Sequence, residues 1–111
     1  MTDTLRSIPH TELQLGGDID LANAKPIGEA LCKALSRRQL PLVVDLADVT
    51  FIDSSAIAMM VNVHRHADAL GVTVTWSNPR REARQVMRIT GVDKVLLVHT
   101  GRSHLVENAP G

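Results

Sequence analysis

Two consecutive serines that follow an aspartate are the residues of this chain with the clearest chemical potential. Asp53, Ser54 and Ser55 come directly after an apolar run that ends with Phe51 and Ile52. A hydroxyl at the start of a helix can cap the free amides of the first turn. It can also carry a phosphate, which those amides and the helix dipole stabilise. The residue types leave both roles open for the serines, and Asp53 could itself be the cap.

The segments on either side of the serines should deliver them to one edge of a sheet. Residues Leu42–Leu46 form an apolar, β-branched run, typical of a strand covered on both faces. After Ser55 the apolar residues recur at helical spacing up to Leu70, and Gly71 then ends the helix. The expected core stripe of that helix consists of Ala56, Met60, Val63 and Ala67.

The rest of the pattern alternates strands and helices. We expect one strand at Leu13–Leu15, ended by Gly16–Gly17, and two further strands at 72–76 and 95–98. We expect helices from Ala24 to Arg38 and from Asn78–Pro79 to Gly91. Such an order predicts parallel strands joined by right-handed crossovers, with functional groups outside the carboxyl ends of the strands. By itself it suggests helices on both faces.

Composition indicates a single soluble domain. The chain has 111 residues, 44% of them apolar, and a formal net charge of zero. Only 2% are aromatic, which argues against a base-stacking platform and so against direct binding of nucleic acid. The lone Cys32 cannot form an internal disulfide, which fits the cytoplasm. No apolar stretch is long enough for membrane insertion.

Other candidate residues carry two interpretations each. Cys32 fits a small buried hydrophobe or a reactive thiol. The row Arg80, Arg84 and Arg88 fits a solvated face or a contact with an acidic partner or a phosphate. The spacing of the histidines, including the near neighbours His64 and His66, predicts no metal site.

An apolar cluster lies at the edge of the helix that begins with Ser54. Ile57, Ala58 and Val61 fall outside its core stripe, where a monomer usually has polar residues. Two interpretations are open at this point. The cluster is either a partner-binding patch rimmed by Asn62 and Arg65, or a chance scatter of exposed apolar side chains.

Several segments resemble those of a known family. Asp48–Ala56, with the sequence DVTFIDSSA, is similar to the signature of STAS domains, particularly the bacterial anti-sigma-factor antagonists. Gly17–Asp20, Asn78–Pro79 and Val86–Val95 resemble further segments of that family in the same order. The chain departs from the pattern at Ala56, where the family usually has glycine.

The resemblance implies an α/β fold with a four- or five-stranded mixed sheet and helices packed on one side. One STAS domain would then occupy residues 1–111, with a core of about 11–98. The stretches 1–10 and 99–111 would be loose ends, with a possible short edge strand around Leu5 and Ile8.

The resemblance also implies a non-catalytic function without cofactor or metal. The unphosphorylated form would bind an anti-sigma factor that has a serine-kinase ATPase domain, and so release the sigma factor. Phosphorylation of Ser54 would break the complex, and a serine phosphatase would restore it. Asp53, Ser55 and Asp20 would support the phosphosite, with Asp53 either capping the helix, orienting Ser54 or coordinating a kinase-bound Mg²⁺. The expected partner-binding residues are Asp18, Ile57, Ala58, Val61, Asn62 and Arg65.

Two other functions stay open. The chain could be a STAS subunit that docks constitutively in a larger assembly, such as a lipid-transport ATPase complex or a stress-signalling scaffold. It could also be a small hydrolase that uses Ser54, although the Gly-x-Ser-x-Gly turn of such enzymes is missing.

Overall fold

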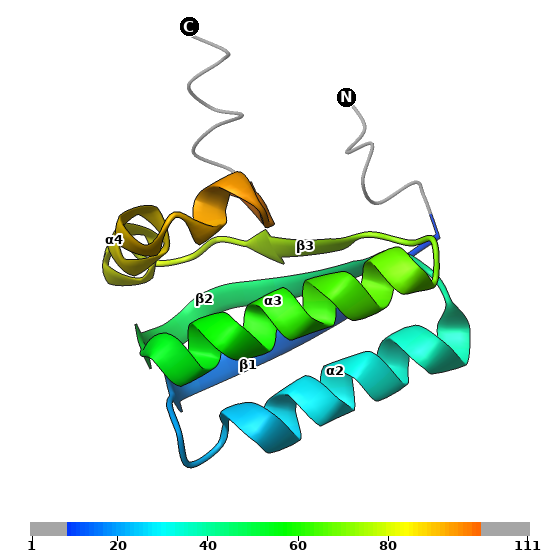
Figure 1. The fold of residues 1–111 in the computed structure, drawn as a ribbon, viewed down its shortest axis with the longest axis horizontal. Helices are drawn as coiled ribbons and strands as arrows, with labels where there is room; N and C mark the ends of the chain where they lie inside the picture. The colour runs from blue at the N-terminus through cyan, green and yellow to red at the C-terminus, as the bar shows by residue number, and fades with distance from the viewer. Residues whose placement is uncertain (1–8, 101–111) are drawn as a thin grey trace, which may run out of the picture.

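The structure is a computed structural model, and it describes residues 9–100. Strands and helices alternate along this part of the chain as predicted (Figure 1). The elements are β1 (Thr11–Ile19), α2 (Ala24–Arg38), β2 (Leu42–Ile52), α3 (Ser54–Ala69), β3 (Val74–Ser77), α4 (Arg81–Thr90), the short 3-10 helix η1 (Val92–Lys94) and β4 (Leu97–His99).

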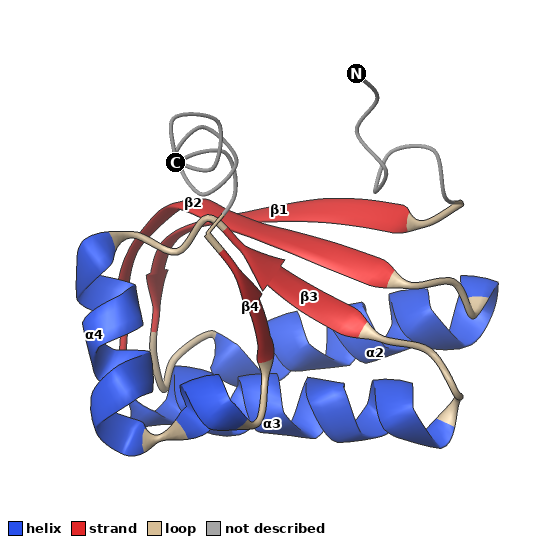
Figure 2. Ribbon diagram, turned by 90° about the horizontal axis from the view of Figure 1, so that it is seen from above, coloured by secondary structure: helices blue, strands red, loops and turns tan. Residues whose placement is uncertain are grey.

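The four strands form one sheet in the order β1-β2-β3-β4, and every pairing among them is parallel. When each new strand is added on the same side, right-handed crossovers place their helices on the same face. Figure 2 shows α2 and α3 together beneath the sheet, with α4 beside the carboxyl ends of the strands. This arrangement confirms the one-sided packing implied by the family resemblance. The expected mixed sheet is not seen, because all strand pairs within residues 9–100 are parallel. The edge strand expected around Leu5 and Ile8 lies outside the described residues.

The core lies between the sheet and the layer formed by α2 and α3. Val44 is fully buried in the middle of the sheet, where it pairs with Leu13 of β1 and Trp76 of β3. Trp76 is fully buried, and Met60 and Val63 of α3 belong to the same apolar cluster. These contacts hold α3 against the sheet, and this packing helps to determine where Ser54 lies at the start of the helix.

Two bulges in β2 shape the end of the sheet. Between Gln14 and Asp18 of β1, the partner strand β2 twice contains one residue more than β1. As a result, Leu46, Val49 and Ile52 are buried at a spacing of three, while pairs of more exposed residues separate them. Each bulge adds a residue that has no partner in β1 and bends the strand. Figure 2 shows β2 curving in this region.

The bulges correct two sequence predictions. Residues Leu42–Leu46 were expected to be the whole strand, but β2 continues to Ile52. Gly16–Gly17 do not end β1, which continues to Ile19. Gly17 has a φ of +74°, so glycine suits the place where the strand register changes. A strand with two bulges loses its alternation of apolar and polar residues, which is the signal that sequence analysis uses.

Helices α2 and α3 approach closely at Gly28. A Cβ atom on Gly28 would lie 2.8 Å from Cγ of Met59, which is closer than two carbon atoms can pack. Glycine inside a helix costs roughly 0.5–1 kcal/mol relative to alanine. Glycine at position 28 therefore allows α2 to pack closely against Met59 of α3.

We expect Gly28→Ala to lower the free energy of unfolding by about 1 kcal/mol, because overpacking outweighs the gain in helix propensity. In a Met59→Ala background the clash is gone, and the same substitution should raise that free energy by up to about 1 kcal/mol. Urea unfolding, followed through the fluorescence of the single, fully buried Trp76, measures both effects. Equal effects in the two backgrounds would contradict this account of the helix packing.

Candidate functional site

Asp53 caps helix α3. Its Oδ1 atom accepts hydrogen bonds from the backbone amides of Ser55, at 2.8 Å, and Ala56, at 3.1 Å. The backbone amide of Asp53 donates to the carbonyl of Ile19 at 3.3 Å, which ties the cap to the end of β1. The cap therefore joins the carboxyl ends of two neighbouring strands to the first turn of α3. Of the roles open to Asp53, the structure shows capping.

The two serines differ in their surroundings. Ser54 is the first residue of α3 and is exposed, whereas Ser55 is partly buried and lines a groove between α2 and α3. Because Asp53 already binds the amides of the first turn, Ser54 is not needed as a cap. Ser54 is also the more accessible of the two serines.

Ala56 fits its position without strain. The residue is fully buried, its amide binds Asp53, and it is absent from the positive-φ positions of residues 9–100. Alanine is also a better helix former than glycine. The departure from the family's usual glycine therefore leaves the turn at Ser54 intact.

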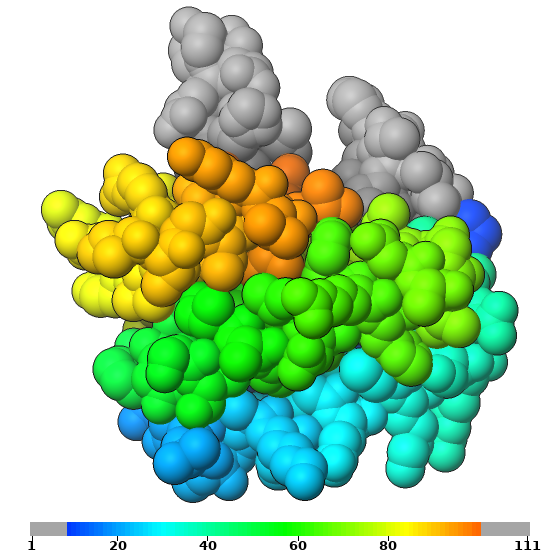
Figure 3. All heavy atoms as spheres, viewed as in Figure 1, coloured from blue at the N-terminus to red at the C-terminus, as the bar shows by residue number. Residues whose placement is uncertain are grey.

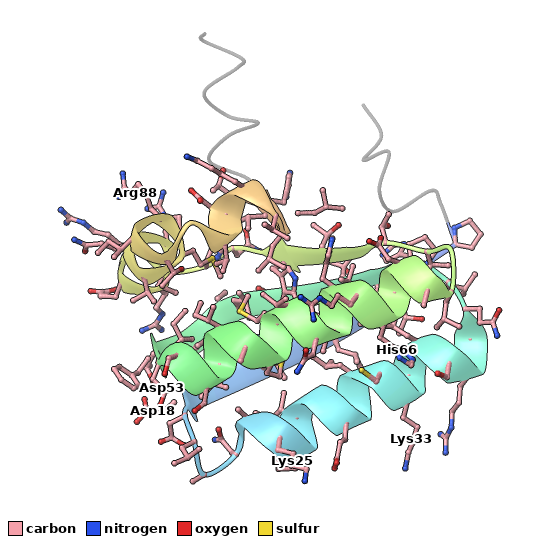
Figure 4. The ribbon with its side chains drawn as sticks, viewed as in Figure 1. Asp18, Lys25, Lys33, Asp53, His66 and Arg88 are labelled. Carbon is pink, nitrogen blue, oxygen red and sulfur yellow. The ribbon has the colours of Figure 1, made fainter. Side chains whose placement is uncertain are left out.

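Two predicted acidic residues, Asp18 near the end of β1 and Asp20 in the turn after it, have partners of their own. Asp18 accepts a hydrogen bond from the Thr50 hydroxyl at 2.7 Å, and it lies at the same end of the sheet as Asp53 (Figure 4). Asp20 binds within its own turn, where Oδ1 accepts from the amide of Ala22 at 3.0 Å. Within residues 9–100 no hydrogen bond connects Asp20 to Ser54, so its expected supporting role stays a prediction.

Sequence analysis missed two exposed apolar residues beside this site. Phe51 is 51% exposed and pairs with Asp18, and Leu21 is 82% exposed in the loop before α2. Phe51 belongs to the apolar run that ends with Ile52, and the second bulge of β2 explains its exposure. Together with Asp18 and Ser54, these residues give the end of the sheet a mixed acidic and apolar surface.

The predicted partner patch on α3 requires one correction. Ile57 is only 8% exposed and belongs to the apolar core. It cannot offer its side chain to a partner without movement of the core. The other four residues remain accessible: Ala58, Asn62 and Arg65 are exposed, and Val61 is partly buried.

A groove of about 420 Å³ runs between α2 and α3 from the serine turn. Most of its lining is apolar or small, and it includes Ala24, Gly28, Cys32, Ser55, Ala58 and Asn62. The seam between the two helices faces the viewer in Figure 3. Burial raises the pKa of the Cys32 thiol, so less of it is thiolate at neutral pH than in an exposed cysteine.

The histidines of α3 are engaged away from Ser54. His66 forms a 2.8 Å hydrogen bond with the Ser36 hydroxyl of α2, and His64 lies 3.8 Å from the carboxylate of Asp68. His64 is ten residues from Ser54 along one helix, about 15 Å away, so it cannot act as a base for that hydroxyl. In the described part of the chain, no three His, Cys, Asp or Glu side chains are grouped to hold a metal ion. No helix between residues 9 and 100 is long and apolar enough to cross a membrane.

Comparison with known proteins shows which family and which solved structures this chain is similar to. A family model described as "Mlab, STAS domain" matches residues 6–99. A candidate anti-sigma factor antagonist from Thermotoga maritima has a similar structure, with a TM-score of 0.73 at 18% identity over 89% of this chain and 88% of that chain. The anti-sigma factor antagonist SpoIIAA in its unphosphorylated form gives a TM-score of 0.69 at 17% identity, over 94% of this chain and 92% of that one. The phosphorylated form of Bacillus SpoIIAA has a TM-score of 0.60 at 17% identity, over 87% of this chain and 88% of that chain. These solved structures share the fold of the chain.

We expect Asp53→Ala to lower the free energy of unfolding by about 1 kcal/mol, because the first turn of α3 loses its cap. Asp53→Asn should have a much smaller effect, since asparagine caps helices about as well as aspartate. Urea unfolding followed through Trp76 compares the two variants. If they lost the same amount of stability, the negative charge rather than the capping geometry would account for the role of Asp53.

Proposed function

The chain belongs to the STAS domain family, and on this premise we propose that it is an anti-sigma-factor antagonist controlled by phosphorylation of Ser54. Its unphosphorylated form binds an anti-sigma factor that carries a serine-kinase ATPase domain, and this releases the sigma factor in the cytoplasm. The kinase then modifies Ser54, the complex dissociates, and a serine phosphatase restores the binding form.

The observation that carries this proposal is the exposed hydroxyl of Ser54 beside a cap that does not depend on it. Asp53 holds the first turn of α3, so Ser54 can be modified without loss of the helix start. Exposed Phe51 and Leu21 lie near it and supply apolar contact area for a partner. A reversible modification at this point would therefore act on the centre of a binding surface.

One phosphate would change the electrostatics of that surface strongly. It adds roughly −1.5 to −2 charge units at neutral pH. The amides of Ser55 and Ala56 already bind Asp53, so the phosphate cannot use them without displacing this carboxylate. It would lie next to Asp53 and at the same end of the sheet as Asp18. The accumulated negative charge opposes contact with a closely packed partner while the domain stays folded.

Binding rather than catalysis is the activity that this site supports. The two histidines of α3 are not placed to act as a base for Ser54, because both lie in the second half of the helix and have their own partners. In the proposed mechanism Ser54 is the substrate of another enzyme.

A second candidate function is a STAS subunit that docks constitutively in a larger assembly, such as a lipid-transport ATPase complex. The observation that favours it is the name of the matching family model, which refers to Mlab and not to the antagonists. In that case the same surface around Ser54 would bind its partner, but modification of Ser54 would not control binding.

We expect a serine-kinase anti-sigma factor from the same organism to phosphorylate this chain at Ser54 when ATP is added. Mass mapping of the modified peptide locates the phosphate. Ser55 should remain unmodified, because it is partly buried in the groove between the helices. Phosphate on Ser55, with none on Ser54, would contradict the assignment.

We expect Ser54→Asp to weaken binding to that anti-sigma factor by about tenfold or more, because even one fixed charge in a packed interface costs more than about 1.4 kcal/mol. Ser54→Ala should bind as the wild type does. Ser54→Asn, which has the size of aspartate without its charge, is the matched control. Calorimetry gives the three dissociation constants. If Ser54→Asp bound as tightly as Ser54→Asn, constitutive docking would be the better account.

A further inference from the structure

Helix α4 presents a row of arginines that have no acidic partner in the part of the chain that the structure describes. Arg81, Arg84 and Arg88 are exposed along one side of this ten-residue helix. Among the described residues, no carboxylate forms an ion pair with any of the three. Arg88 points away from the body of the domain in Figure 4. The neighbouring Arg80 is different, because its Nε donates a hydrogen bond to the carbonyl of Ala47 at 2.9 Å.

The row is unfavourable for the isolated helix. Arg84 and Arg88 are four residues apart, and like charges at this spacing destabilise a helix by a few tenths of a kcal/mol. Glu82 is the one acidic residue of α4. The residues three and four positions after it, where a basic side chain would pair with it, are Gln85 and Val86. Among residues 9–100, then, no carboxylate pairs with these arginines, and their guanidinium groups are available to a binding partner.

The surface beside the row is hollowed, and its lining mixes charged and apolar side chains, Asp93 among them. A depression of about 340 Å³ is lined by Arg84, Met87, Arg88, Asp93, Val98 and Thr100, so it lies between α4 and the edge formed by η1 and β4. Ile89 is 76% exposed on α4, and Val95 and Leu97 are also exposed after it. Guanidinium groups at the rim and aliphatic side chains around them suit a ligand with carboxylates and apolar side chains together.

We propose that the surface made by Arg81, Arg84, Arg88 and the adjoining depression binds a short acidic segment of a partner protein. Its carboxylates pair with the guanidinium groups, and one apolar side chain enters the depression. This surface is separate from the turn at Ser54, and the proposal does not depend on phosphorylation.

The charge distribution favours a short segment over a membrane or a nucleic acid. Asp18 and Asp53 lie at the same end of the sheet as α4 (Figure 4), and the net charge of the chain is zero. A flat anionic membrane or a long polyanion would meet these carboxylates as well as the arginines, which would weaken its binding. A short peptide can contact α4 alone.

The test is a titration of the ¹⁵N-labelled full chain with a short peptide of glutamate and leucine. We expect amide shifts confined to α4, η1 and β4, which weaken as salt is added. Arg84→Glu/Arg88→Glu should weaken binding by about tenfold, since two exposed pairs become repulsive. Arg37→Glu/Arg38→Glu, at the exposed end of α2, is the matched control and should bind as the wild type does.

Three results would overturn the proposal. One is the absence of shifts in α4 with the peptide. Another is an equal response to a peptide in which lysine replaces glutamate. The third is tighter binding of vesicles containing phosphatidylglycerol, or of a short DNA duplex, through the same arginines. All four substituted arginines are exposed, and the dispersion of the spectra shows directly that each variant is folded.

Discussion

The pairing of β1 with β2 is the constraint on which the functional end of this domain depends. Because β2 contains an extra residue at two places, its register with β1 ends with Ile19 opposite Ile52. The next residue, Asp53, donates its amide to Ile19 and accepts two amides of α3. The position of Ser54 at the first turn therefore follows from the strand pairing, through a short chain of hydrogen bonds.

The same pairing explains why the surface at this end is both acidic and apolar. In a regular strand Phe51 would point to the opposite face from its neighbours Thr50 and Ile52. The bulge instead leaves Thr50 and Phe51 together on the exposed side, where Thr50 binds Asp18. Apolar side chains outside the core are tolerated in a stable domain when they serve binding. Here the cost is small, because Ile52 and Val49 on either side still fill the core.

A net charge of zero conceals a separation of charge at this end of the molecule. Asp18 near the end of β1, Asp20 after it and Asp53 after β2 supply carboxylates, and guanidinium groups lie along α4. The two groups approach the same edge of the sheet because parallel strands all end there. Separated charges of this kind do little for the stability of the fold, since exposed charges are screened by solvent. Separated charges can, however, orient a partner and select among partners.

The sequence by itself determined the order of the strands and helices, the start of α3 at Ser54, and the family, because these depend on local patterns such as DVTFIDSSA and on breaks at Gly71 and Gly91. It could not determine which face of β2 each residue after Leu46 occupies, since bulges remove the alternation from which faces are inferred. The burial of Ile57 and the exposure of Phe51 were therefore decided only by the tertiary structure. Ile57 is buried because other elements close over α3, and Phe51 is exposed because β2 is one residue longer than its partner at that point. Both outcomes depend on contacts between segments distant in the chain, which local patterns do not contain.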